Sequence, residues 1–157
     1  MPFIKRLEQS VIGKVAEHMV ITIDEEPPVA TLEKPLNEAR VALVTTAGIR
    51  NATDPPFDTK KGDPTFRVID GDVDFQTLVV NHDHYNTKRA KEDINIVFPL
   101  ERLRELQSEG VIGSVAPRHF GWMGYIPRTA KLMKKTAPMM ADMLLEDHVD
   151  IVLLSPG

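Results

Sequence analysis

The chain has 157 residues, 42% hydrophobic and 27% charged, the size and composition of one globular domain that buries a sizeable core unaided. Its formal net charge of −4 gives no indication of a nucleic-acid partner, and its lack of cysteine excludes a disulfide framework or a cysteine metal site within it. It shows no secretory signal and no apolar run near the ~20 residues of a membrane helix, so we expect a cytoplasmic protein with no membrane partner.

The first part of the chain predicts a helix, a short strand and an irregular connection before a buried strand. Apolar residues recur at helical spacing over residues 2–19, and residues 20–23 can add a strand. Residues 24–35 are acidic and rich in proline, which predicts an irregular connection. Residues 40–46 (RVALVTT) form a near-continuous apolar run, which is typical of a parallel strand covered on both faces.

The middle of the chain alternates loops with short strands. Residues 51–65 are rich in proline and glycine and predict a long loop. Residues 66–69 and 77–80 predict short strands. Residues 81–93 are polar and contain the sequence His-Asp-His-Tyr at positions 82–85.

The last third of the chain predicts two helices and another buried strand. A helix opens at Pro99 and stops at Gly110, and residues 111–115 can form a short strand. The second helix runs from Pro127 to about residue 146, with a kink or a break at Pro138. Its expected core face comprises Ala130, Met133, Ala137, Met140 and Leu144. Residues 150–154 (DIVLL) predict a second buried strand.

This order of elements predicts one α/β domain over residues 1–157. We expect a three-layer sandwich with a mostly parallel, flavodoxin- or Rossmann-like sheet. The sheet is expected to be incomplete at the C-terminus, because a buried strand at residues 150–154 needs a following helix to cover it. Sites in such sheets lie beyond the carboxyl ends of the strands. We expect three polar stretches there: residues 45–46, 82–85 and 118–119.

The candidate site residues have more than one interpretation each. Three histidines are candidate acid–base or anion-binding groups: His82, His84 and His119. They could instead bind a metal, although short histidine pairs are a weak signal without cysteines, and residues 82–83 could simply cap a turn. The candidate substrate-binding residues are Thr45, Thr46, Tyr85 and Arg118. Arg118 can grip a carboxylate in a bidentate pair, or form a surface ion pair with Glu101 or Asp93.

Several segments resemble the selenoprotein B family of the glycine, sarcosine, betaine and D-proline reductases. The matching segments keep one order along the chain: VALVTTAGI (41–49), DPPFD (54–58), GDPTFRVI (62–69), HDHY (82–85), DINIVFPLERLRELQSEGVIGSVAPRHFGWMGYI (93–126) and VDIVLLSPG (149–157). The block at 93–126 is not a generic α/β pattern, which makes the resemblance specific.

The resemblance implies that this chain is the N-terminal portion of a reductase subunit. In that family a selenocysteine or cysteine directly follows the strand that matches residues 150–154, so this chain would stop before its nucleophile. We expect either a UGA codon after Gly157 or a cut at that point, and the nucleotides after the Gly157 codon test this. The chain itself has no cofactor, and selenocysteine is expected only in the full-length protein.

The implied chemistry is a reductive cleavage. A selenolate or thiolate attacks the carbon of a small amino-acid or amine substrate that another subunit has activated, and an amine or similar leaving group departs. Selenenyl-sulfide or disulfide exchange then returns the nucleophile to its reduced form. The expected partners are other reductase subunits in a homo- or hetero-oligomer, and the 157 residues alone should be inactive. Two alternatives remain at this point: a metal- or small-ligand-binding module that uses His82, His84 and His119, and a structural subunit without chemistry.

Overall fold

The computed structural model describes Glu26 and residues 30–157 of the chain. The chain divides into two compact units, Met1–Thr31 and Leu32–Gly157, and all the described helices and strands belong to the second. The helix predicted over residues 2–19 and the strand predicted over 20–23 lie outside the described residues. Within the described part of the chain, no helix combines the length and the apolar character needed to cross a membrane.

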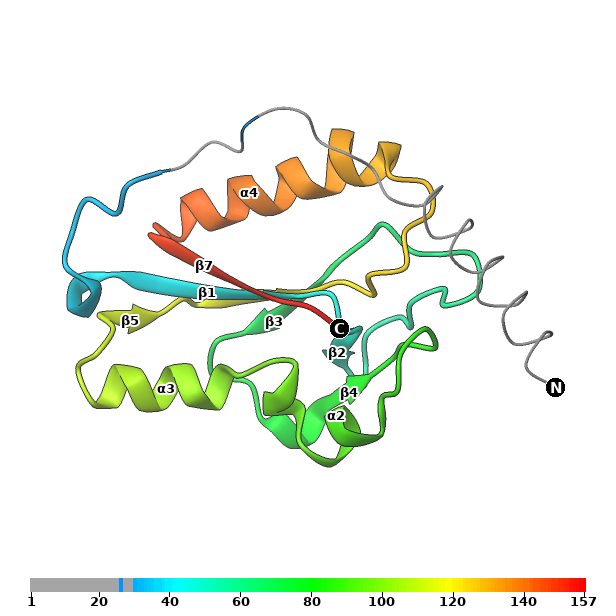
Figure 1. The fold of residues 1–157 in the computed structure, drawn as a ribbon, viewed down its shortest axis with the longest axis horizontal. Helices are drawn as coiled ribbons and strands as arrows, with labels where there is room; N and C mark the ends of the chain where they lie inside the picture. The colour runs from blue at the N-terminus through cyan, green and yellow to red at the C-terminus, as the bar shows by residue number, and fades with distance from the viewer. Residues whose placement is uncertain (1–25, 27–29) are drawn as a thin grey trace, which may run out of the picture. The chain divides into compact units, whose positions relative to one another are not determined.

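The central strand of the larger sheet is β1 (Arg40–Thr45), which confirms the strand predicted at residues 40–46. β7 (Ile151–Ser155) pairs with it in parallel, with Leu43 opposite Leu153. The segment predicted at 150–154 is therefore a strand, shifted by one residue. Figure 1 shows the two strands side by side, ending near the C-terminus.

The opposite edge of β1 is shared by two short parallel strands, β5 (Ser114–Val115) and β6 (Arg118–Gly121). Arg40 lies opposite Ser114, whereas Val44 lies opposite Phe120. The partner segment therefore uses more residues than β1 over this stretch, and the ladder is interrupted around Pro117, which has no N–H to donate. The sequence predicted a strand within residues 111–115, where β5 lies, but did not predict β6.

Three further strands complete the described sheets. β3 (Arg67–Asp70) runs antiparallel to β6, at the edge of the larger sheet. β2 (Ile49–Asn51) pairs antiparallel with β4 (Leu78–Val80) in a separate two-stranded sheet. The strands predicted at 66–69 and 77–80 are confirmed with shifts of one residue, and β2 was not predicted.

Helices cover both faces of the larger sheet. α3 (Leu100–Ser108) lies on one face and α4 (Ala137–Glu146) on the other, as Figure 1 shows. Alternate residues of β1 explain this arrangement: Val41 and Leu43 belong to one buried cluster, and Ala42 and Val44 to the other. The short helices are α2 (Lys88–Glu92), η1 (Leu36–Glu38), η2 (Phe75–Thr77), η3 (Ile94–Ile96) and the π-helix η4 (Leu132–Thr136).

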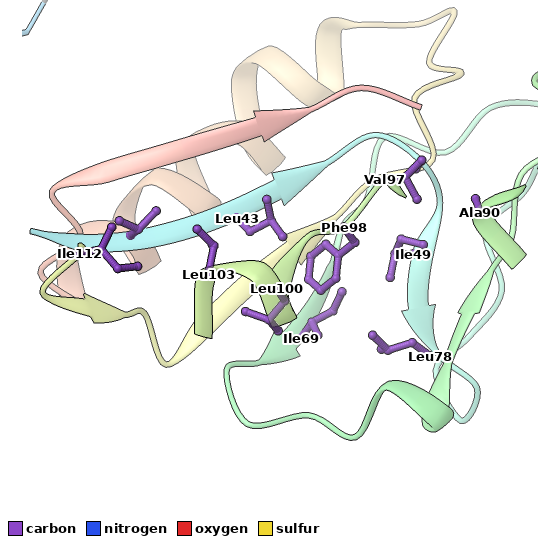
Figure 2. Close-up of a cluster of buried hydrophobic side chains, with 12 residues drawn as sticks. Leu43, Ile49, Ile69, Leu78, Ala90, Val97, Phe98, Leu100, Leu103 and Ile112 are labelled. Carbon is purple, nitrogen blue, oxygen red and sulfur yellow. The ribbon is translucent and has the colours of Figure 1, made fainter. Parts of the chain in front are cut away.

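The cluster beneath α3 joins the two sheets. Phe98, Leu100, Ile49 and Ile69 are fully buried, and Figure 2 shows Phe98 between Leu100 of α3 and Ile49 of β2. Because one core holds both β1 and the β2–β4 pair, the residues that follow β4 are fixed beside the end of β1. The prediction of a mixed α/β fold with a mostly parallel sheet is confirmed.

The second predicted helix differs in detail from the structure. It does not begin at Pro127: the helical residues start at Ala130, and the π-helix η4 precedes α4. Pro138 lies in the first turn of α4, where its missing N–H removes one bond of the regular ladder. The wider π-turn shifts the helical phase, so Leu132 packs against the core while Met133 is 69% exposed.

Candidate functional site

The carboxyl ends of β1 and β7 meet through backbone and side-chain hydrogen bonds. The Thr46 N–H donates to the Ser155 carbonyl at 3.1 Å, and the Gly157 N–H donates to Thr46 Oγ1 at 3.2 Å. Gly157 packs so closely on Ala47 that a Cβ at position 157 would overlap the Ala47 backbone. Thr46 therefore fixes the course of the chain as it leaves β7.

The segment after β6 forms the next wall of the site. The Gly48 N–H donates to the Trp122 carbonyl at 2.7 Å. Gly124 has φ +78, and a Cβ there would lie 2.8 Å from the Thr46 carbonyl oxygen and 3.5 Å from His82 Nε2. A side chain at position 124 would thus separate Thr46 from His82, and glycine allows the three segments to converge.

His82 is buried at the end of the segment that follows β4. Its Nδ1 accepts a hydrogen bond from the His84 N–H at 3.0 Å, so the neutral ring carries its proton on Nε2. Burial lowers the pKa of His82, and the neighbouring His84 lowers it further. At neutral pH His82 is therefore a hydrogen-bond donor, held in one tautomer.

His84 is exposed, and it differs from His82 in having a ring nitrogen that is free, within the described part of the chain, to accept a proton. Its Nε2 lies 2.8 Å from the Thr59 carbonyl oxygen, which requires an Nε2–H donor. Its ring stacks on Tyr125, with centroids 3.9 Å apart and planes inclined by 27°. Among the described residues nothing hydrogen-bonds its Nδ1, so this atom is left as a proton acceptor facing solvent.

Tyr85 connects the histidine segment to the end of β1. Its hydroxyl donates to the Ala47 carbonyl at 3.1 Å, and its ring meets His82 edge to face at a centroid distance of 4.7 Å. Burial raises the pKa of the Tyr85 phenol, which keeps it in the donor form. The hydroxyl predicted to bind substrate is thus occupied by a backbone contact.

Thr45 and Arg118 do not face this site. Thr45 is fully buried, and its Oγ1 accepts from the Ala47 N–H at 3.1 Å, which is a strand cap. Arg118 begins β6, which runs parallel to β1, and so lies at the opposite end of the strands from the site. Its guanidinium donates to Asp147 in a bidentate pair at 2.7 and 2.8 Å and contacts Glu146 at 3.1 Å, not the predicted Glu101 or Asp93.

His119 is likewise remote from the other two histidines. It is fully buried in β6, near Phe98 of the α3-side core, and its Nδ1 accepts the Leu43 N–H at 2.9 Å. Burial lowers its pKa to about 4. Among the described residues no group of three or more His, Cys, Asp or Glu side chains could hold a metal, so the predicted three-histidine ligand set does not form.

An apolar groove adjoins the polar cluster. Its volume is about 610 Å³, and it lies between the sheet and the η4–α4 segment. Thr46 and Gly124 line it, and Gly124 also lies beside His82. Residues 121–124 were assigned no place in the site from the sequence, so their role as one of its walls was missed. The one available signal was the pair of glycines in GWMG, because closely spaced glycines permit close backbone approach.

The chain is similar to one protein family and to several curated relatives. Residues 3–156 match the family described as glycine/sarcosine/betaine reductase selenoprotein B. The chain is 40% identical over 148 residues to the D-proline reductase subunit gamma of Acetoanaerobium sticklandii, covering 94% of this chain and 61% of that protein.

Two other relatives are named glycine reductase complex component B subunit gamma. The Carboxydothermus hydrogenoformans protein is 30% identical, with 96% of this chain and 37% of that protein covered. The Symbiobacterium thermophilum protein is 29% identical, with 88% and 33% covered. The chain thus spans about three fifths or about one third of the length of these relatives, and no solved structure matches it.

Proposed function

This chain belongs to the glycine/sarcosine/betaine reductase selenoprotein B family, and from this membership we propose that it forms part of a selenol- or thiol-dependent reductase that cleaves an amino acid or an amine. The observation that carries the proposal is the convergence at Thr46. This residue binds the Gly157 N–H at the end of β7 and approaches Gly124 beside His82. The proposed nucleophile position, directly after Gly157, therefore adjoins the histidine cluster.

A selenol or thiol at that position would supply the attacking atom, as its anion. The residues of this chain would prepare its surroundings. Thr46 holds the Gly157 backbone, and the neutral His82 is fixed as a donor by the His84 N–H. The Nδ1 of His84 is suited to accept a proton, because the ring donates through Nε2 to the Thr59 carbonyl and Nδ1 has no hydrogen-bond partner among the described residues.

The proposal assigns different roles to the predicted site residues. His84 acts as the acid–base group, while His82, Thr46 and Tyr85 position the edge of the site. Three predicted residues are not part of it: His119 and Thr45 are engaged in the core, and Arg118 lies at the opposite end of the strands. A module that binds a metal through His82, His84 and His119 has no support from this geometry.

The same proposal extends to the complete sheet, the nucleophile, the partner subunits and the substrate. The complete sheet is flavodoxin- or Rossmann-like, and selenocysteine or cysteine follows Gly157 in the full-length protein. Other reductase subunits assemble with it in the cytoplasm. The substrate is D-proline or a related small amine, because the relative that is 40% identical is named as a D-proline reductase subunit.

The experiment uses the full-length protein with cysteine directly after Gly157, combined with the remaining reductase subunits. Dithiol-dependent cleavage is measured with D-proline, glycine, sarcosine and betaine. We expect cleavage of at least one substrate, and about a 10²-fold or greater loss of kcat in His84→Ala, which is typical of removing a general acid or base.

The matched control is His148→Asn, because His148 is an exposed histidine outside the site. Its backbone has φ 52, a conformation that asparagine tolerates. The control should retain full activity and the same pH profile. A complete complex that cleaves none of the four substrates, or in which the two variants lose activity equally, contradicts the proposal.

A further inference from the structure

The strand β7 is an edge strand with the composition of an interior one. Among the described residues only β1 pairs with it. Its sequence IVLLS carries apolar side chains on both faces, a pattern found in strands that are covered on both sides. Yet Val152, Leu153 and Leu154 are all exposed, and Leu154 is 70% exposed.

The strand β3, at the other edge of the same sheet, is built differently. It begins with Arg67 and ends with Asp70, and both charged side chains discourage further pairing. β7 has no charged residue between Ile151 and Ser155. The two edges therefore differ in the protection that natural sheets use, and only the β7 edge is suited to accept another strand.

The pairing of β7 with β1 determines which of its backbone N–H and carbonyl groups point away from the sheet. The Ser155 carbonyl accepts from Thr46, so Ser155 is directed toward β1. Residues alternate in direction along a parallel strand, so Leu153 is also directed toward β1, whereas Val152 and Leu154 direct their N–H and carbonyl groups outward. Among the described residues nothing pairs with these outward backbone groups, so they form an open edge that another strand can join.

The apolar groove extends this surface on the α4 side. Leu154 forms one wall of it, and Met133, 69% exposed, forms part of the opposite wall. None of the described residues that line it is charged. A polypeptide segment that paired with the β7 edge would therefore lie directly beside an apolar groove of about 610 Å³.

We propose that the β7 edge and this groove form the docking surface for the part of the reductase polypeptide that this chain does not match. The relatives contain that part: the match covers 61% of the D-proline reductase subunit gamma. Its docking chemistry is an uncharged strand that pairs with Val152 and Leu154, joined to an apolar helix face that fills the groove. The inference concerns assembly of the sheet and does not depend on which substrate is cleaved.

The test uses the 157-residue chain and, as a separate polypeptide, the part of the Acetoanaerobium sticklandii subunit outside the match. Binding is measured by calorimetry, and hydrogen exchange is followed at single amides by NMR. We expect a 1:1 complex in which the Val152 and Leu154 amides gain protection. The Leu153 amide, already directed toward β1, should gain much less.

A pair of variants tests the surface itself. Leu154 and Leu145 are equally exposed, at 70% and 71%, but Leu145 lies on α4 outside the groove. Leu154→Lys should weaken binding roughly ten-fold or more, because it places a charge in a buried apolar contact. Leu145→Lys should leave the affinity unchanged.

Three results would overturn the inference. They are the absence of binding, equal effects of the two lysine variants, and protection of Leu153 without protection of its neighbours. Formation of a dimer of this chain through β7, with no displacement by the added polypeptide, would also contradict it by assigning the surface to a second copy. None of these measurements uses catalysis, so they are independent of the reductase proposal.

Discussion

At the scale of single residues, the His119 side chain accepts a backbone hydrogen bond where the sheet ladder is interrupted. The interruption around Pro117 deprives the Leu43 N–H of a backbone acceptor, and His119 Nδ1 takes that place at 2.9 Å. We expect His119→Leu to lower the free energy of unfolding by about 1 kcal/mol. The cost of orphaning the Leu43 N–H, about 1–3 kcal/mol, is partly offset because the variant also removes the His119 Nε2–H, which is buried with no hydrogen-bond partner among the described residues. Urea unfolding at pH 7.5 measures it. A leucine variant as stable as the parent chain would contradict this structural role.

The same residue predicts a dependence of stability on pH. Burial, assisted by the positive charge of Arg104, lowers the pKa of His119 to about 4, whereas an unfolded histidine titrates near ~6.5. The contribution of the neutral ring is therefore complete above pH ~6.5. It is lost as the pH falls toward 4, and the loss is on the order of 3 kcal/mol.

Because the pKa of His82 is also lowered, the difference between the parent chain and His119→Leu isolates the effect of His119. That difference should shrink as the pH falls from about 6.5 toward 4. Unfolding curves across this range measure it, and a constant difference would show that His119 does not titrate there.

The two ion pairs of Arg118 should contribute differently to stability, because their carboxylates differ in exposure to solvent. The Asp147 carboxylate is 11% exposed and receives two hydrogen bonds from Arg118, whereas Glu146 is 68% exposed and receives one. We expect Arg118→Lys and Asp147→Asn to destabilise the fold by about 1–2 kcal/mol, because lysine cannot make the bidentate pair. Glu146→Gln should change it by less than about 0.5 kcal/mol. Equal effects in thermal unfolding would be evidence against this ranking.

At the scale of elements, the approach of β6 to β2 depends on a glycine. A Cβ at Gly121 would overlap the carbonyl oxygen of Ile49, whereas a Cβ at Gly110 would meet nothing within 4 Å. Gly121→Ala should cost more than about 2 kcal/mol, since backbone atoms must shift. Gly110→Ala should cost about 1 kcal/mol, from its φ of +72 alone. The reverse order in urea unfolding would refute the close approach.

The elements that the sequence predicted are those in which one signal dominates. β1 and β7 are uninterrupted apolar runs, and α3 combines a proline start, buried leucines and a glycine stop. β6 was missed because its sequence RHFG has no alternation, and its pairing is fixed by β1 and β3. The kink or break predicted at Pro138 takes the form of the π-helix η4 just before it, a form that the proline alone did not predict.

At the scale of the whole molecule, the site depends on which strands are neighbours. Thr46 and the segment 82–85 lie near each other, but not as neighbours at the end of one parallel sheet: β4 belongs to the separate two-stranded sheet, and the core shared with β1 fixes their proximity. Arg118 was expected beside them too, but it begins its strand instead of ending it. Two residues adjacent in sequence, Arg118 and His119, therefore lie away from the site for different reasons: strand direction for Arg118 and core burial for His119. The sequence alone could not place either residue, because both placements depend on where β6 begins and how it pairs with its neighbours.

The lack of cysteine also determines what the whole chain can do by itself. Reductive cleavage transfers two electrons, and in a thiol-dependent enzyme these come from a thiol or selenol. The 157 residues contain none, and the groups at the site, an imidazole, a hydroxyl and a phenol, move protons but not electrons. We expect no turnover of D-proline, glycine, sarcosine or betaine by the purified chain with dithiothreitol, measured by release of the reduced product. Turnover by the cysteine-free chain would require a different electron carrier and would remove the role proposed for the position after Gly157.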